Sequence, residues 1–284
     1  MAGSDDKVGR VRAYLEYFRD LGVHDFYRNK TLEPVELPVA LEAEGHRVVT
    51  AGPAKVELTA PPVTVLETLT STELNIVKLV SFNDLAPLPS ARVATESRIA
   101  ALEAISTDIG DCIRCPLAYG GRRKIVFGNG DPNARLMFVG EGPGADEDEQ
   151  GEPFVGKSGQ LLNNMIGAMG LRREDVYIAN IVKCRPPANR APEPVEANTC
   201  TQFLLRQMDV VQPEVIVALG ATAAMYLLGV KQTLASLRGS FHPVRGAKCA
   251  VTFHPAYLLR DPTKKGDAWK DLQMVMAELG LNQK

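Results

Sequence analysis

The stretch LMFVGEGPGADEDEQGEPFVG, residues 136–156, joins an apolar run to a glycine-rich, acidic loop. The apolar run is short and uninterrupted, which is typical of a strand buried on both faces of a parallel sheet. Three later runs share this character: Val176–Val182, Val215–Leu219 and Ala250–Phe253. Helical patterns alternate with these runs, at Ser158–Met169, Pro194–Val211, Ala221–Leu228 and in a last helix with Asp267 as its N-cap. The alternation predicts a three-layer α/β/α domain with a central four-stranded parallel sheet.

The composition changes near residue 97, which predicts an N-terminal extension over residues 1–97 and the α/β domain over residues 98–284. The extension begins with apolar residues at helical spacing between Val8 and Phe18, so we expect an amphipathic helix there. Residues 33–92 lack sustained periodicity and predict a mostly disordered linker, with a short docking segment around Leu74–Phe82. Recruitment of a protein partner is one hypothesis for this extension.

The chain has 284 residues, 45% of them hydrophobic, and a formal net charge of −2. A nucleic acid would therefore have to bind at a local basic patch rather than over the whole surface. The sequence contains no apolar stretch of the ~20 residues that span a bilayer. Its first residues lack the apolar core of a signal peptide, so we expect a cytoplasmic protein without a membrane partner.

The acidic loop suits a flat, uncharged ligand better than a phosphate. Gly140-x-Gly142-x-x-Ala145 fits a loose dinucleotide fingerprint, but the carboxylates that follow would repel phosphate, and the next expected helix starts only near Ser158. Phe154 could stack on an aromatic ring, and the Asn180 amide complements a base edge with one N–H and one carbonyl, as in uracil. His254 could donate a hydrogen bond to an oxygen that gains charge. Each residue alone also has an ordinary structural explanation, and their convergence at one sheet edge favours a binding site.

Four cysteines are expected to form one ligand set rather than to be unrelated thiols: Cys112, Cys115, Cys184 and Cys200. The first two are spaced C-x2-C, whereas the second two are too far apart for an ordinary zinc ribbon. Spacing leaves zinc and an iron-sulfur cluster open, and we favour a [4Fe-4S] cluster. Cys249 lies in a predicted strand, and we expect it to be buried and to pack as a small apolar residue. Arg185 and Arg190 beside this set form either a phosphate-binding patch or a solvated charged surface.

Three separated motifs and the cysteine frame together resemble family 4 uracil-DNA glycosylases. The motifs are GEGPGADEDEQGEPFVGKSGQLL at 140–162, YIANIVKCRPPANRAP at 177–192 and FHPAYLLRDP at 253–262. The resemblance covers about residues 98–282. It implies a monofunctional, monomeric enzyme of base excision repair, which flips deoxyuridine out of single- or double-stranded DNA and hydrolyses the N-glycosidic bond.

The resemblance also implies site roles. Phe154 would stack on uracil, Asn180 would read its edge, and His254 would stabilise the departing uracil anion. Glu141 would organise the site and its water, and Glu147 would lie near C5 and exclude the methyl group of thymine. Gly142 stands where family 1 enzymes have an aspartate, so we expect a dissociative reaction that depends on leaving-group stabilisation.

DNA contacts and a structural cluster are implied as well. The residues expected to contact DNA are Lys157, Ser158, Arg185, Arg190, Leu258, Leu259 and Arg260, of which the two leucines and Arg260 would enter the space left by the flipped nucleotide. The [4Fe-4S] cluster would be held by Cys112, Cys115, Cys184 and Cys200. Covalent trapping on DNA is not expected, because no histidine lies between Gly156 and Asn180.

Two other classes of function compete with this interpretation. One is a catalytically silent iron-sulfur protein that binds DNA or transfers electrons. It has no reason to retain Phe154, Asn180 and His254 together. The other is a nucleotide-dependent oxidoreductase, which the carboxylates of the loop disfavour.

Overall fold

Four parallel strands form the centre of the sheet, in a computed structural model that describes residues 79–281. The strand order is β1-β3-β2-β4-β6-β5, in which the inner four strands are parallel and the two edge strands antiparallel. Their bounds are Asn129–Gly130 (β1), Leu136–Gly140 (β2), Tyr177–Asn180 (β3), Val215–Leu219 (β4), Phe241–Val244 (β5) and Ala247–Thr252 (β6). The predicted parallel centre is confirmed, and β1 and β5 extend it to six strands.

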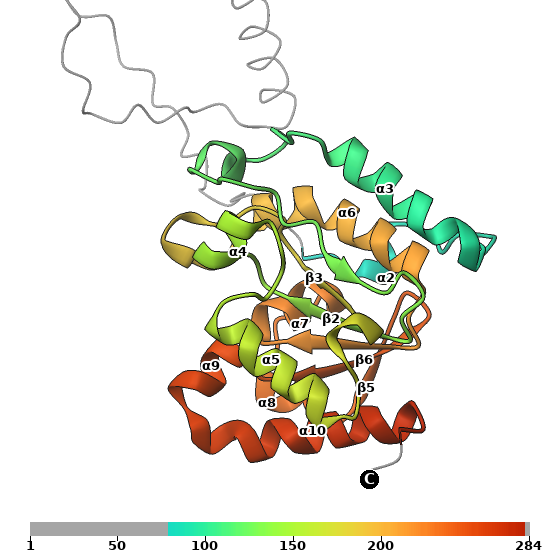
Figure 1. Ribbon diagram of the computed structural model, residues 1–284, viewed down its shortest axis with the longest axis vertical. Coiled ribbons are helices and arrows are strands. Elements are labelled where there is room, and N and C mark those ends of the chain that lie inside the picture. Colours follow the sequence, from blue (N-terminus) through green and yellow to red (C-terminus); the bar gives the residue numbers. More distant parts are fainter. Residues whose placement is uncertain (1–78, 282–284) are drawn as a thin grey trace, which may run out of the picture. The chain divides into compact units, whose positions relative to one another are not determined.

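Helices cover both faces of this sheet (Figure 1). Helices α3 and α6 lie on one side, and α5 and α10 lie on the other. The helices are α2 (Phe82–Leu85), α3 (Arg98–Ile109), α4 (Ala145–Gln150), α5 (Lys157–Ala168), α6 (Pro194–Val211), α7 (Ala221–Leu228), α8 (Leu234–Leu237), α9 (Pro255–Arg260) and α10 (Lys265–Glu278). The three-layer α/β/α architecture expected from the sequence is therefore present.

Strand β2 shows how the apolar run builds two cores at once. Met137 and Val139 pack into a cluster with α3, α6 and α7, whereas Leu136 and Phe138 pack into a second cluster with α5 and α10. Successive side chains of a strand point to opposite faces, so a strand between two helical layers must be apolar at every position. This requirement explains why the buried strands read as uninterrupted apolar runs.

Two sequence expectations about helices were wrong. The acidic run was expected to be part of a loop, but it forms the short helix α4 directly after Gly144. Acidic side chains in its first turn, Asp146 to Asp148, interact favourably with the helix dipole. The last helix starts at Lys265 rather than after Asp267, because a 3-10 turn at Pro262–Lys264 leads directly into it.

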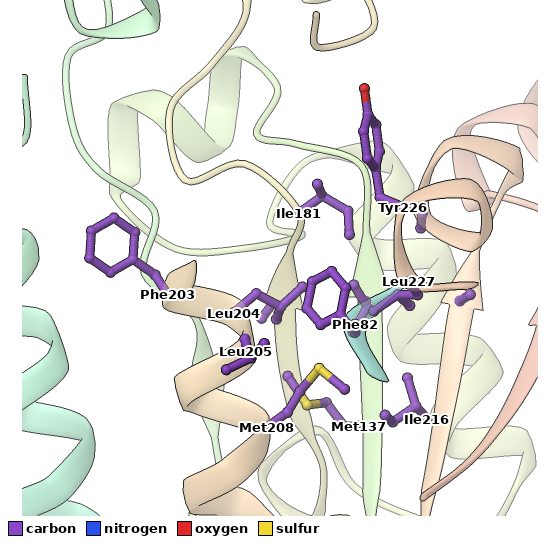
Figure 2. Packing of buried hydrophobic residues seen from close by; sticks show 14 of the residues in the cluster. Phe82, Met137, Ile181, Phe203, Leu204, Leu205, Met208, Ile216, Tyr226 and Leu227 are labelled. Carbon is purple, nitrogen blue, oxygen red and sulfur yellow. The ribbon is translucent and has the colours of Figure 1, made fainter. Parts of the chain in front are cut away.

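Residues 79–97, which we assigned to the extension, contribute to the core of the described unit. The Phe82 side chain is fully buried, and Figure 2 shows it among side chains of β2, α6 and α7. Arg245 donates to the carbonyl oxygens of Ala86 and Pro87, and also pairs with Asp209 at 2.6 Å. The expected amphipathic helix and most of the linker lie outside the described residues. Within the described range, no helix has the length and apolarity needed to cross a membrane.

Candidate active site

A cavity of about 400 Å³ opens where β2, β3 and β6 end, at the carboxyl edge of the sheet. Ligand sites of open parallel sheets form at this edge. Its lining residues are Glu141, Gly142, Gly144, Glu147, Phe154, Ser158, Asn180, Asn189, His254, Ala256 and Arg260. All six residues that we expected to bind the base or act on it therefore lie in one cavity.

Gly140 permits two of these side chains to meet. It ends β2 and is the register partner of Asn180 on the parallel strand β3. A Cβ atom on Gly140 would lie 2.4 Å from Asn180 Oδ1 and 2.6 Å from Phe154 Cζ, well inside van der Waals contact. Only glycine allows both side chains to lie against the end of β2 without displacement.

Asn180 carries an unused acceptor. Its side chain is 1% exposed, and its Oδ1 atom has no hydrogen-bond partner in the described part of the chain. An unpaired buried acceptor costs free energy unless a ligand satisfies it. The orphaned oxygen therefore indicates a ligand that presents a hydrogen-bond donor.

Phe154 is held in an unusual backbone conformation. Its φ of 53° is in the left-handed region, which is rare for an aromatic residue. Arg173 fixes this turn by donating to the carbonyl oxygens of Phe154, at 3.2 Å, and Pro153. The Phe154 ring centroid lies 5.6 Å from that of His254, with the ring planes tilted by 32°. The two rings thus form adjoining walls of the cavity.

His254 is held as a neutral imidazole. It caps the N-terminus of α9, where its Nδ1 atom accepts a hydrogen bond from the Ala256 backbone N–H at 3.1 Å. Burial lowers the pKa of His254 to about 4, and the nearby Arg260 cation acts in the same direction. Because Nδ1 is the acceptor, the ring proton of the neutral form must be on Nε2. His254 can therefore donate one hydrogen bond from Nε2.

Glu147 organises the loop around the cavity. Its carboxylate accepts hydrogen bonds from the backbone N–H groups of Gly144, Val155 and Gly156, at 2.9 to 3.0 Å. These bonds tie the start of α4 to the chain just after Phe154. Glu141 also lines the cavity, and its carbonyl oxygen accepts from the Val182 N–H, which joins the loops after β2 and β3.

The residues expected to contact DNA divide into three groups. Ser158 and Arg260 line the cavity, and Lys157 and Leu259 are exposed next to them. Leu258 is a correction, because it is only 1% exposed and lies on α9 next to α5, so its side chain is not at the surface where DNA would be contacted.

Arg185 and Arg190, two of the three arginines expected to contact DNA, already have partners. Arg190 forms a bidentate ion pair with Glu196, at 2.7 and 2.8 Å. This pair fixes the loop before α6 to the first turn of that helix. Arg185 donates to Asn189 Oδ1 at 2.7 Å, and Asn189 itself lines the cavity. The loop that carries Arg185 and Arg190 therefore also has a structural role beside the cavity.

The four cysteine thiols surround one small pocket, together with Ile109, Ile125 and Phe203. Burial raises the pKa of Cys115 and Cys184 and raises that of Cys200 to about 12. Within residues 79–281, no three His, Cys, Asp or Glu side chains are grouped as ligands of a metal ion. Cys249 is fully buried in β6, away from this pocket.

Two residues that the sequence analysis did not single out support the cavity. Arg173, nineteen residues after Phe154, holds its turn, and no local pattern announces this contact. Lys183 is buried directly behind Asn180. The sequence could have indicated the role of Lys183, because a lysine at the end of an apolar run, between Asn180 and Cys184, is unusual.

The fold and this cavity define a class of protein. A family model described as the uracil DNA glycosylase superfamily matches residues 127–273. Among curated relatives, the type-4 uracil-DNA glycosylase of Thermotoga maritima is 48% identical over 162 residues, which cover 56% of this chain and 84% of the relative. The type-4 uracil-DNA glycosylase of Pyrobaculum aerophilum is 42% identical over 174 residues, which cover 58% of this chain and 88% of the relative. The chain therefore belongs to the uracil-DNA glycosylase superfamily and, within it, to the type-4 uracil-DNA glycosylases.

Proposed function

We propose that this chain binds uracil-containing DNA, flips the deoxyuridine into the cavity and hydrolyses its N-glycosidic bond. The products are free uracil and an abasic site, as in base excision repair. The names of the relatives specify this substrate for those proteins. The observation that carries the proposal is the buried Oδ1 atom of Asn180, which has no hydrogen-bond partner among the described residues, on a residue that lines a cavity of about 400 Å³.

Asn180 reads the uracil edge in this proposal. Its Oδ1 atom accepts the N3–H of uracil, and its Nδ2 amide donates to O4. Phe154 stacks on the face of the base from the adjoining wall. Cytosine presents the opposite donor and acceptor pattern, so the fixed amide selects uracil.

His254 stabilises the leaving group. As the N1–C1′ bond breaks, its electron pair leaves with uracil, and charge develops on O2. The Nε2–H group of neutral His254 donates to that oxygen, while water adds its oxygen to C1′ and loses a proton to solvent. Glu141 orders this water, and Gly142 leaves room where a carboxylate could have stood. Electrostatic stabilisation of the anion then carries most of the catalysis.

The loop fixed by Glu147 excludes thymine. Three backbone amides hold its carboxylate, so this wall of the cavity cannot retreat easily from a methyl group at C5. The contacts to the DNA backbone come from Ser158 and Arg260 in the cavity lining and from Lys157, Arg185 and Arg190 beside it, and Leu259 fills the gap left by the flipped nucleotide.

We also propose that Cys112, Cys115, Cys184 and Cys200 hold a [4Fe-4S] cluster. A cluster of this kind takes one thiolate on each iron, and the four cysteines that line this one pocket would supply its full ligand set. The cluster would be structural, because it anchors Cys184 four residues after Asn180. A cytoplasmic, monomeric enzyme remains our expectation.

The direct test is single-turnover cleavage of a labelled oligonucleotide that contains one deoxyuridine, followed by alkali to break abasic sites. Cleavage is expected at deoxyuridine and absent from a matched thymidine oligonucleotide. Tight DNA binding by cluster-loaded protein without any cleavage would instead support the silent DNA-binding protein.

Cys184→Ala is expected to abolish the visible absorption of the cluster, because one of its four ligands is lost. The measurement is the absorption spectrum of protein purified without oxygen, with iron content determined in parallel. Cys249→Ala is the matched control and should retain full absorption, since Cys249 lies outside the cysteine pocket. A normal spectrum for Cys184→Ala would contradict the ligand assignment.

The His254 imidazole is expected to titrate near pH 4 instead of 6.5. In the unfolded chain this imidazole takes up a proton below about pH 6.5, whereas in the folded chain it takes up the proton only near pH 4. The free energy of unfolding therefore falls as the pH drops through this window, and the contribution is constant above it. An NMR titration checks the pKa, with the signal identified by its loss in His254→Gln. A midpoint near 6.5 would show that the imidazole is not held neutral.

A further inference from the structure

Lys183 is a fully buried lysine whose ammonium group donates to two neutral oxygens. Its Nζ atom lies 3.0 Å from the carbonyl oxygen of Asn180 and 2.6 Å from Gln207 Oε1. Burial of a charged group is costly, and such groups persist where their hydrogen bonds fix a geometry that an apolar side chain would not. The position of Lys183 therefore calls for a specific role.

The ammonium group is held in place by a buried network. Gln207 on α6 directs its Oε1 atom to Lys183, because its Nε2 group donates to the Phe127 carbonyl at 3.0 Å and to the Tyr177 hydroxyl at 3.1 Å. Gln207 is itself 0% exposed. The network thus connects the end of β3 to the helix that covers it.

The backbone of Lys183 is anchored to the cysteine pocket. Its N–H group donates to Cys200 Sγ at 3.3 Å, and its carbonyl oxygen accepts from the Val126 N–H at 2.8 Å. A single residue therefore contacts both the wall of the cysteine pocket and the backbone of Asn180.

Asn180 needs such support, because its side chain forms no hydrogen bond within residues 79–281. Its Oδ1 atom is unpaired, so the direction of the amide depends on the backbone at the end of β3 and on the close approach of Gly140. The Lys183 ammonium bonds to the carbonyl oxygen of this same residue. A shift of this peptide group would move the amide relative to a bound base.

We propose that Lys183 is a positioning residue, which fixes Asn180 for reading the uracil edge and ties that edge to the cysteine pocket. This inference rests on the role proposed above for Asn180. Small displacements of a recognition group reduce rates by about 10²-fold, so we expect Lys183→Met to slow single-turnover uracil release by about 10- to 100-fold. Methionine keeps an apolar stem and removes the donors.

A double-mutant cycle with Asn180→Ala tests whether Lys183 acts through Asn180. In the Asn180→Ala background, Lys183→Met should change the single-turnover rate by no more than about twofold, because the group that it positions is already gone. A merely structural effect would also disturb Phe154 and His254, and would reduce the rate by the same factor in both backgrounds. Equal factors would overturn the proposal.

Thr201→Val is the matched control. It removes a buried hydroxyl group that donates to the Asn198 carbonyl oxygen within α6, the helix of Gln207, and it leaves both bonds of the Lys183 ammonium intact. Its rate should stay within about twofold of the unmodified chain. A loss as large as that of Lys183→Met would show that general disturbance of this core slows the reaction, and would count against a specific role for Lys183.

Gln207→Met keeps the proposal testable if Lys183→Met does not fold, as judged by thermal unfolding and by the cluster absorption. This variant releases the ammonium group from one of its two partners. It should slow uracil release in the same direction, and the effect should again vanish in the Asn180→Ala background. If Asn180→Ala alone leaves the rate unchanged, the proposed function of Asn180 fails, and the role of Lys183 fails with it. If Asn180→Ala is slow but the effects are additive, only the role of Lys183 fails.

Discussion

Asn180→Ala is expected to slow single-turnover release of uracil by about 10³-fold, because it removes both hydrogen bonds to the base edge. The fold should be retained, since the unpaired Oδ1 atom stabilises nothing in the described chain. The measurement is the rate of abasic-site formation with enzyme in excess over a deoxyuridine oligonucleotide.

Asn133→Ala provides the control for Asn180→Ala. Asn133 is exposed and precedes β2, at the opposite edge of the sheet from the cavity. The Asn133→Ala variant should cleave the deoxyuridine oligonucleotide at the rate of the unmodified chain. A drop of less than about tenfold for Asn180→Ala, with normal thermal unfolding, would mean that this amide does not read the base.

Gly140→Ala is the second change with a large expected effect. The added methyl group would lie 2.4 Å from Asn180 Oδ1 and 2.6 Å from the Phe154 ring, so both side chains must move. We expect the single-turnover rate to fall by about 10²-fold or more, because the stacking and the edge-reading groups are displaced together.

Gly167→Ala is the matched control for Gly140→Ala. Gly167 lies on α5, and a Cβ atom there would meet nothing within 4 Å. This variant should retain its rate and gain slightly in stability, since alanine favours a helix by about 1 kcal/mol over glycine. A fully active Gly140→Ala protein would show that the end of β2 can yield without loss of the site.

The sequence predicted elements best where burial and local signals agree. Helices α6 and α7 were predicted with their observed bounds, because Pro194 begins one and Gly220 and Gly229 flank the other. Strand β1 has only two residues, and β5 contains Pro243, so neither shows an apolar alternation. Helix α4 was missed because an acidic run resembles a loop, and the bond from the Gly144 N–H to the Glu147 carboxylate that closes its first turn is not visible in the sequence.

The cavity was predictable as a set of residues, but the supports behind it were not. Asn180 ends β3, His254 follows β6 and Phe154 lies in the segment between β2 and β3, so the edge of a parallel sheet brings them together. The left-handed turn at Phe154 depends on Arg173, which reaches it from the loop before β3. Contacts of this kind depend on tertiary packing, which no local pattern in the sequence encodes.

The burial of Phe82 determines where the chain can be shortened. A chain that begins at residue 79 retains the Phe82 side chain, whereas removal up to residue 97 would leave an empty volume between β2, α6 and α7. Loss of a buried phenylalanine side chain typically costs about 3–5 kcal/mol. Truncated proteins meant to reveal a partner of the N-terminal segment should therefore begin no later than residue 79, so that lost binding is not mistaken for lost folding.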